Sequence, residues 1–182
     1  MEEDIITIGL FGRPQVGKTM MCEKYTDEIL KDAPTVDDNY KLIKIRGRSV
    51  KADIYAYNKS QRDFGDRNTH YQNCDYFIFV YSVVDKPSLL SLEDIYSDIQ
   101  SVRSSPIKCL IAGNKIDLKN DDSIQIEEAE KLAEKFNCQV IETSAKTQQN
   151  IKKLFETAIV DFLNSKYPDS LQPEEGGCCT II

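Results

Sequence analysis

Residues 5–26 read IITIGLFGRPQVGKTMMCEKYT and carry the strongest structural signal in the chain. Residues 5–11 form a β-branched apolar run, and residues 12–19 fit the pattern G-x-x-x-x-G-K-[ST]. A helix is expected from Lys18 to about Thr26. A glycine-rich turn between a strand and a helix is typical of a phosphate-binding loop, because backbone N–H groups and the helix N-terminus face the phosphates. The motif predicts a nucleoside triphosphate without choosing its base.

Strand and helix patterns alternate along the rest of the chain. Residues 40–45 and 50–57 alternate apolar and polar around a short turn, which indicates an antiparallel hairpin. Further strands are predicted at 76–83, 108–112 and 139–142, and further helices at 88–102, 126–136 and 151–163. This order predicts a three-layer α/β domain with a mostly parallel sheet, whose ligands lie beyond the carboxyl ends of the strands.

Length, charge and cysteine spacing narrow the class of protein. The chain has 182 residues, enough for one domain, and a net charge of -7, which argues against a nucleic-acid-binding surface. Its start does not resemble a secretory signal, and no apolar stretch approaches the ~20 residues that span a bilayer. Four cysteines have no metal-binding or redox spacing, and we expect reduced structural thiols in a cytosolic setting: Cys22, Cys74, Cys109 and Cys138.

Two later motifs choose the base. Asn114-Lys115-Ile116-Asp117 follows the apolar run KCLIA, and Glu142-Thr143-Ser144-Ala145-Lys146 follows the last predicted strand. Together with the phosphate-binding loop they resemble the N-K-x-D and S-A-K guanine motifs of the Ras superfamily. The resemblance implies that Asp117 accepts hydrogen bonds from the guanine ring and its amine, and that Asn114 ties the base site to the phosphate loop. It also implies that Lys115 lies over the ring and that the Ala145 N–H meets the guanine carbonyl.

The same resemblance implies a complete site and fold. Residues 34–40, PTVDDNY, are similar to the effector loop of the Ras and Rap branch, so effector proteins are expected to bind through Thr35–Tyr40. Lys18 is expected to reach the β and γ phosphates, and Thr19 and Thr35 to ligate Mg²⁺ beside GTP or GDP. The implied fold is a small G domain over residues 1–167, with a six-stranded, mostly parallel sheet, one antiparallel strand and about five helices. The implied nucleotide-binding residues are Gly12, Arg13, Pro14, Gln15, Val16, Gly17, Lys18, Thr19, Thr35, Asn114, Lys115, Asp117, Ser144, Ala145 and Lys146.

The hydrolytic motif of the family, D-T-A-G-Q, is not preserved. An ungapped alignment places Ala56 at the aspartate that holds a Mg²⁺ water, and Lys59 at the glycine that binds the γ-phosphate. Ser60 then stands at the glutamine that orients the attacking water; a one-residue slip places Gln61 there but restores nothing else. Arg13 and Pro14 also depart from the small residues of Ras, and Pro14 lies where an activating protein inserts its arginine.

The last residues, 168–182, are predicted to be a flexible tail that ends in a C-a-a-X pattern at Cys179. Prenylation of Cys179, with palmitoylation of Cys178 as the second signal, predicts a protein that is cytosolic before lipidation and then bound to the cytoplasmic face of a membrane. The protein is expected to be a monomer.

Two functions remain open from the sequence. The first is a signalling switch that binds GTP and hydrolyses it slowly. The second is a pseudo-GTPase, an interaction module that holds a guanine nucleotide and does not cycle. A third, an ATP-using enzyme, is disfavoured by Asp117, because adenine presents the opposite hydrogen-bonding pattern to that carboxylate.

Overall fold

The computed structural model describes residues 4–26, 40–45, 47–57 and 67–168. Within these residues the predicted strands and helices are present, together with a further helix, α2, and a short 3-10 turn, η1. The elements, in chain order, are β1 (Asp4–Phe11), α1 (Lys18–Thr26), β2 (Tyr40–Ile45), β3 (Arg48–Ala56), α2 (Arg67–Asn73), β4 (Tyr76–Ser82), α3 (Lys86–Val102), β5 (Cys109–Asn114), η1 (Ile116–Leu118), α4 (Ile126–Phe136), β6 (Gln139–Glu142) and α5 (Ile151–Lys166).

In the described part of the chain, the strands form one six-stranded sheet in the order β2-β3-β1-β4-β5-β6. Only the β2–β3 pair is antiparallel, and the other four pairings are parallel. The predicted six-stranded, mostly parallel sheet with one antiparallel strand and about five helices is confirmed. Strand β1 lies between β3 and β4, and the chain adds its later strands first on the β3 side and then on the β4 side. Ligands of such sheets bind beside this change of side, at the carboxyl ends of the strands.

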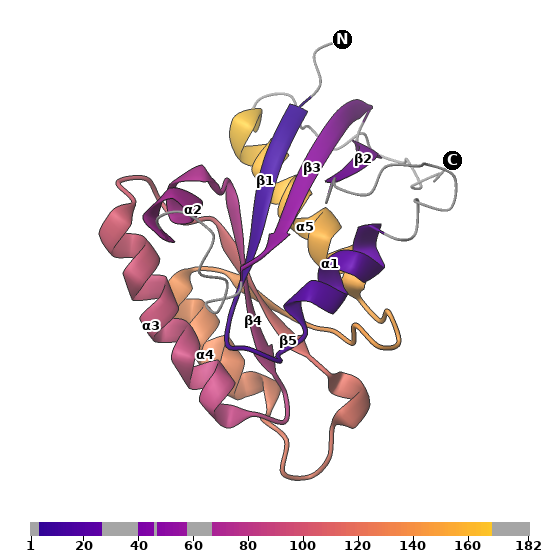
Figure 1. The fold of residues 1–182 in the computed structure, drawn as a ribbon, viewed down its shortest axis with the longest axis vertical. Coiled ribbons are helices and arrows are strands. Elements are labelled where there is room, and N and C mark those ends of the chain that lie inside the picture. Colours follow the sequence, from indigo (N-terminus) through magenta and orange to yellow (C-terminus); the bar gives the residue numbers. More distant parts are fainter. Residues whose placement is uncertain (1–3, 27–39, 46, 58–66, 169–182) are drawn as a thin grey trace.

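The sheet is the middle of three layers (Figure 1). Helices α1 and α5 cover one face, and α2, α3 and α4 lie on the other. Strand β4 is buried along its whole length, and its residues alternate between the two cores: Ile78 and Val80 pack on the α1/α5 side, and Phe77 and Phe79 on the α3/α4 side. This alternation follows from the two-residue period of a strand and explains why an almost wholly apolar run is a central strand here.

Some boundaries differ from the sequence prediction. Helix α3 begins at Lys86, two residues early, because Pro87 is well suited to the first turn of a helix, where its missing N–H is not needed. Strand β5 continues to Asn114, so the first residue of the N-K-x-D motif belongs to the sheet. Helix α5 continues to Lys166, whose ammonium pairs with the buried Asp4 carboxylate at 2.8 Å. In the described ranges, no helix is both long enough and apolar enough to cross a membrane.

Candidate nucleotide-binding site

The phosphate-binding loop between β1 and α1 needs its two glycines for space as well as for backbone conformation. Gly12 has φ +154°, and a Cβ there would lie 2.1 Å from the Val80 carbonyl oxygen. Gly17 has φ +104°, and a Cβ there would lie 2.3 Å from Nδ2 of Asn114. Both distances are below any tolerated contact, so the close approach of this loop to β4 and β5 depends on glycine.

Lys18 lies buried at the start of α1, and its ammonium is held across the loop. Nζ donates hydrogen bonds to the carbonyl oxygens of Gly12, at 3.0 Å, and Arg13, at 2.9 Å. Burial lowers the pKa of Lys18 to about 8, because the low-dielectric surroundings disfavour the charged form. A phosphate beside this ammonium would supply the counter-charge that the two carbonyls supply only in part.

Three loop side chains face solvent, whereas Val16 is buried in the α1/α5 core. Arg13, Pro14 and Gln15 are exposed, and Gln15 has φ 66°, a left-handed conformation that is uncommon for a residue other than glycine. Thr19, the second residue of α1, is also exposed. The N-terminal turn of α1 therefore presents the Thr19 hydroxyl to solvent, which is the arrangement that phosphate and Mg²⁺ binding require.

Asn114 joins the three loops of the site. Its side chain is 1% exposed. Nδ2 donates to the Val16 carbonyl at 2.8 Å, and Oδ1 accepts from the Ala145 N–H at 3.0 Å and from Thr143 Oγ1 at 3.4 Å. Asn114 therefore ties the phosphate loop to the S-A-K loop, as its role in the motif predicts. The Ala145 N–H is engaged by Asn114 here, and its contact with a guanine carbonyl stays a prediction.

Asp117 is oriented by the S-A-K loop. Its Oδ1 accepts a hydrogen bond from Ser144 Oγ at 2.5 Å, and its Oδ2 lies 3.9 Å from the Lys146 ammonium. Ser144 Oγ in turn accepts from the Thr147 N–H at 3.1 Å, which fixes the hydroxyl. The preceding Lys115 has φ 69°, a left-handed turn that ends β5 and redirects the chain into η1. The carboxylate expected to read the base is thus held by a buried serine on another loop.

Three supporting contacts were not predicted from the sequence. Thr143 donates to Asn114, Lys119 pairs with Glu142 at 2.9 Å, and Asn150 Nδ2 donates to the Glu142 carbonyl at 2.8 Å. The first two link the end of β5 and the loop after it to the end of β6 and the loop after it, and the third joins the two ends of the β6–α5 loop. Only the polar character of the residues around both motifs hinted at these contacts.

The sequence model of the Ras family matches residues 7–164. The chain belongs to the Ras family. It is 32% identical to the Ras-related protein O-RAL of Diplobatis ommata over 157 residues, which is 83% of this chain and 74% of that protein.

Two further relatives are the Ras-related proteins RABC2a and Rab-12. The chain is 27% identical to RABC2a of Arabidopsis thaliana over 152 residues, 81% of this chain and 72% of the relative. It is 28% identical to Rab-12 of Rattus norvegicus over 175 residues, 93% of this chain and 71% of the relative. In this Ras-family small GTPase, the loops after β1, β5 and β6 carry the described residues that are predicted to bind the nucleotide.

At the end of β3, the chain lacks a side-chain group that the Ras-family motif has at this position. Ala56 is the last residue of β3, pairs with Leu10 of β1 and packs against the α1/α5 core. A methyl group stands where the family has a carboxylate, and no group of three or more His, Cys, Asp or Glu in the described residues would hold a metal. Several predicted site residues lie outside the described residues: Thr35, Lys59, Ser60, Gln61, Cys178 and Cys179.

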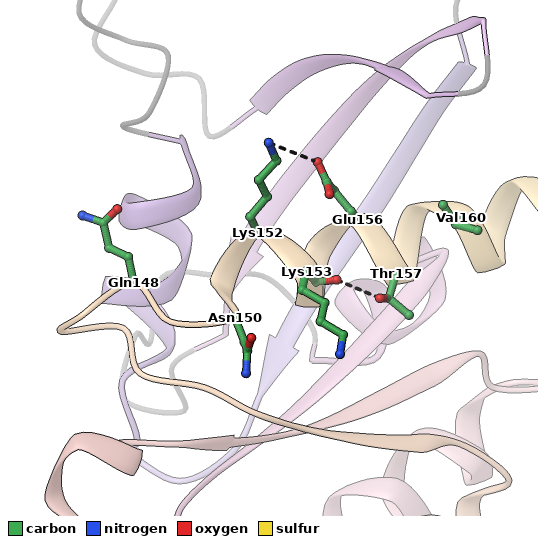
Figure 2. A pocket seen from close by; sticks show the side chains of 7 residues that line it. All are labelled: Gln148, Asn150, Lys152, Lys153, Glu156, Thr157 and Val160. Carbon is green, nitrogen blue, oxygen red and sulfur yellow. Dashed lines mark hydrogen bonds and ion pairs between the residues drawn. The ribbon is translucent and has the colours of Figure 1, made fainter. Parts of the chain in front are cut away.

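A separate surface hollow lies along the first turns of α5, shown in Figure 2. Lys152 pairs there with Glu156 at 3.9 Å, and Thr157 Oγ1 donates to the Lys153 carbonyl at 2.8 Å. Its lining is Gln148, Asn150, Lys152, Lys153, Glu156, Thr157 and Val160. None of the predicted nucleotide-binding residues is among them, so this hollow is distinct from the nucleotide site.

Proposed function

We propose that this Ras-family protein is a membrane-associated signalling protein that binds GTP and GDP with Mg²⁺ and hydrolyses GTP slowly. The observation that carries the nucleotide specificity is a set of hydrogen bonds between the loops: Asn114 joins the phosphate loop to Ala145, and the adjacent Ser144 holds Asp117. A carboxylate fixed in this way selects guanine, because adenine would leave its oxygens facing an acceptor. Effectors are proposed to bind through Thr35–Tyr40, and membrane attachment through Cys179 rests on the sequence pattern alone.

The guanine proposal is tested by competition. Purified protein should prefer GDP over ADP by about 10⁴-fold or more, since a site built to hydrogen-bond a group rejects the analogue that lacks it. Asp117→Asn should shift this preference towards xanthine nucleotides, because the amide donates where the carboxylate accepts. Similar affinities for GDP and ADP in the unmodified protein would overturn the proposal.

The described residues fit Mg²⁺ only in part. Thr19 presents a hydroxyl at the first turn of α1 and would hold the ion, which would neutralise the charge of the phosphates. Ala56 offers no oxygen to order a Mg²⁺ water. Nucleotide binding should therefore depend on Mg²⁺ more weakly than in a relative that keeps the aspartate.

Substitution of Ala56 tests this directly. Ala56→Asp should strengthen the Mg²⁺ dependence of GDP dissociation about tenfold or more, the usual effect of a supporting ligand. Ala56→Asn is the matched control, with the same shape and no charge, and should change it little. Equal Mg²⁺ dependence in the Asp variant and the parent would show that Ala56 does not occupy the metal-supporting position.

Slow hydrolysis follows from three departures at the γ-phosphate. Ser60 replaces the glutamine that orients water, and Lys59 replaces the glycine whose N–H binds the γ-phosphate. Pro14 is exposed where an activating protein must insert its arginine. In Ras that arginine contributes about 10³–10⁵ in rate. We expect single-turnover hydrolysis at or below the unassisted rate of the family and no acceleration by a Ras or Rap activating protein. Strong acceleration would point to Gln61 in the slipped alignment.

Ala56 also favours the second candidate, a pseudo-GTPase that holds its nucleotide as a structural cofactor. The nucleotide that copurifies with the protein separates the two functions. GDP indicates a working, slow enzyme, and GTP indicates that hydrolysis is lost. An adenine nucleotide would contradict both.

A further inference from the structure

Two cysteines far apart in the sequence meet at the edge of the sheet opposite the nucleotide site. Leu110 of β5 pairs in register with Gln139 of β6, so Cys109 and Cys138, each one residue earlier, lie side by side. Neighbouring strands are about 4.8 Å apart, within the range of Cα separations that disulfides span, about 4.4–6.8 Å. In the sequence these cysteines have no redox spacing. The pairing of β5 with β6 brings them together.

The two side chains lie on the same face of the sheet. Both pack against the core on the α3/α4 side. The backbone at Cys138 is fixed by its N–H, which donates to the Ala133 carbonyl at 3.0 Å and closes the end of α4 after the left-handed Asn137. The backbone at Cys109 is fixed by Tyr76, whose hydroxyl donates to the Cys109 carbonyl at 3.3 Å. Neither sulfur needs a change of fold to reach the other.

The two cysteines differ in access. Cys109 is buried, whereas Cys138 is half-buried, and both line a surface hollow with Lys108, Asn137 and Asp161. The neighbouring Cys109 thiol lowers the pKa of Cys138, while Cys138 and burial raise the pKa of Cys109. Burial raises the pKa of Cys22 and of Cys74 to about 12. Among the described cysteines, Cys138 therefore combines partial exposure with a lowered pKa, and Cys109 is the thiol next to it.

We propose that Cys109 and Cys138 form a redox-active dithiol that a peroxide converts to a disulfide. The Cys138 thiolate attacks one peroxide oxygen; the O–O bond breaks and hydroxide leaves, taking up a proton to become water. The product is Cys138 sulfenic acid. The Cys109 sulfur then attacks the Cys138 sulfur, the S–O bond breaks, and the departing hydroxide takes the Cys109 proton as a second water. Two thiols and one hydrogen peroxide give one disulfide and two waters.

A disulfide between Cys109 and Cys138 would link β5 and β6, the two strands that lead into the loops predicted to bind guanine. Strand β5 runs from Cys109 to Asn114, and β6 leads from the residue after Cys138 to Thr143 and Ser144. A disulfide between Cys109, the first residue of β5, and Cys138, the residue before β6, closes a loop of about 30 residues. It prevents the starts of the two strands from separating. The restriction of the unfolded chain alone predicts an increase in the thermal midpoint of about 5–10 °C.

The test uses the full chain, purified reduced and treated with one equivalent of hydrogen peroxide at pH 8. After alkylation of the remaining thiols, peptide mapping should find Cys109 linked to Cys138, with a mass loss of about 2 Da for the two hydrogens. Mapping is required because a Cys178–Cys179 bond would give the same mass. In the reduced protein, Cys138 should be alkylated at least about tenfold faster than Cys22 or Cys74.

Two variants make the result decisive. Cys138→Ser changes a half-buried residue and should abolish both the linked peptide and the rise in thermal midpoint. Cys74→Ala is the matched control, because Cys74 and Cys109 are equally buried at 6% exposure, and it should keep both effects. Recovery of Cys109 and Cys138 as alkylated thiols after peroxide treatment, or linkage of Cys138 to a different cysteine, would overturn the proposal.

Discussion

Replacing Lys18 by methionine should stabilise the nucleotide-free protein while it weakens nucleotide binding. In the folded chain this ammonium is buried, and its polar contacts are hydrogen bonds to the Gly12 and Arg13 carbonyls. Methionine is also a long, unbranched side chain but carries no charge. The substitution therefore separates the cost of burying the charge from its use in binding phosphate.

The magnitude follows from the pKa of Lys18, which burial lowers from 10.5 to about 8. The difference, 10.5 − 8, is about 2.5 units, and at about 1.36 kcal/mol per unit the buried charge costs about 3 kcal/mol at pH 7. Against this, the variant loses two hydrogen bonds worth about 0.5–1.5 kcal/mol each. The net expectation is a stabilisation of about 1 kcal/mol, or about 2–4 °C in thermal midpoint for a chain of this size.

The pH dependence gives the sign of the effect independently. As pH rises from 8 towards 10.5, folded Lys18 loses its proton before unfolded Lys18 does, so the cost of the charge disappears. The advantage of the variant should be full below pH 8 and should shrink across this window. Nucleotide affinity of the parent should fall over the same range, by up to about tenfold per pH unit above 8, because phosphate binds the protonated lysine.

The assay is thermal unfolding of nucleotide-free parent and variant at pH 7 and pH 10, paired with nucleotide titration. Lys131→Met, at an exposed position on α4, is the control and should change neither quantity. The Lys18 variant should bind GDP at least about 100-fold more weakly, the equivalent of about 3 kcal/mol. A variant that is less stable than the parent at pH 7, or a stability difference that does not narrow at pH 10, would refute the assigned burial cost.

Other substitutions test the framework of the site. Asn114→Ala should lower the free energy of unfolding by about 2–5 kcal/mol in urea titrations, because it leaves the buried Val16 carbonyl and Ala145 N–H without partners. Gly12→Ala should cost about 3 kcal/mol or more by the same measurement, since its Cβ would meet the Val80 carbonyl at 2.1 Å; a neutral effect would show that the loop can move away from β4. Arg103→Met should speed amide exchange in α2, whose carboxyl end is held by guanidinium hydrogen bonds to the Tyr71 and Cys74 carbonyls at 2.7 Å; unchanged exchange would mean that α2 is held by packing alone.

The sequence by itself determined the fold class, the strand and helix order and the three described nucleotide loops. These features are encoded by residues close together in the chain. The apolar run of β4 predicts a strand buried on both faces, and Gly12 and Gly17 mark a turn that other residues cannot adopt. Alignment with the family's D-T-A-G-Q motif identified Ala56 as a departure, and the structure places it at the end of β3.

Only the tertiary structure decided which distant groups touch. Asn114 contacts Val16 and Ala145, and Cys109 lies beside Cys138, because strands separated in the chain are neighbours in the sheet. Burial, and with it the lowered pKa of Lys18, likewise depends on every element packed around the side chain. Periodicity shows which way a residue faces within its own strand, but the residue opposite is set by strand order and register. Those are properties of the assembled sheet and not of any single stretch of the sequence.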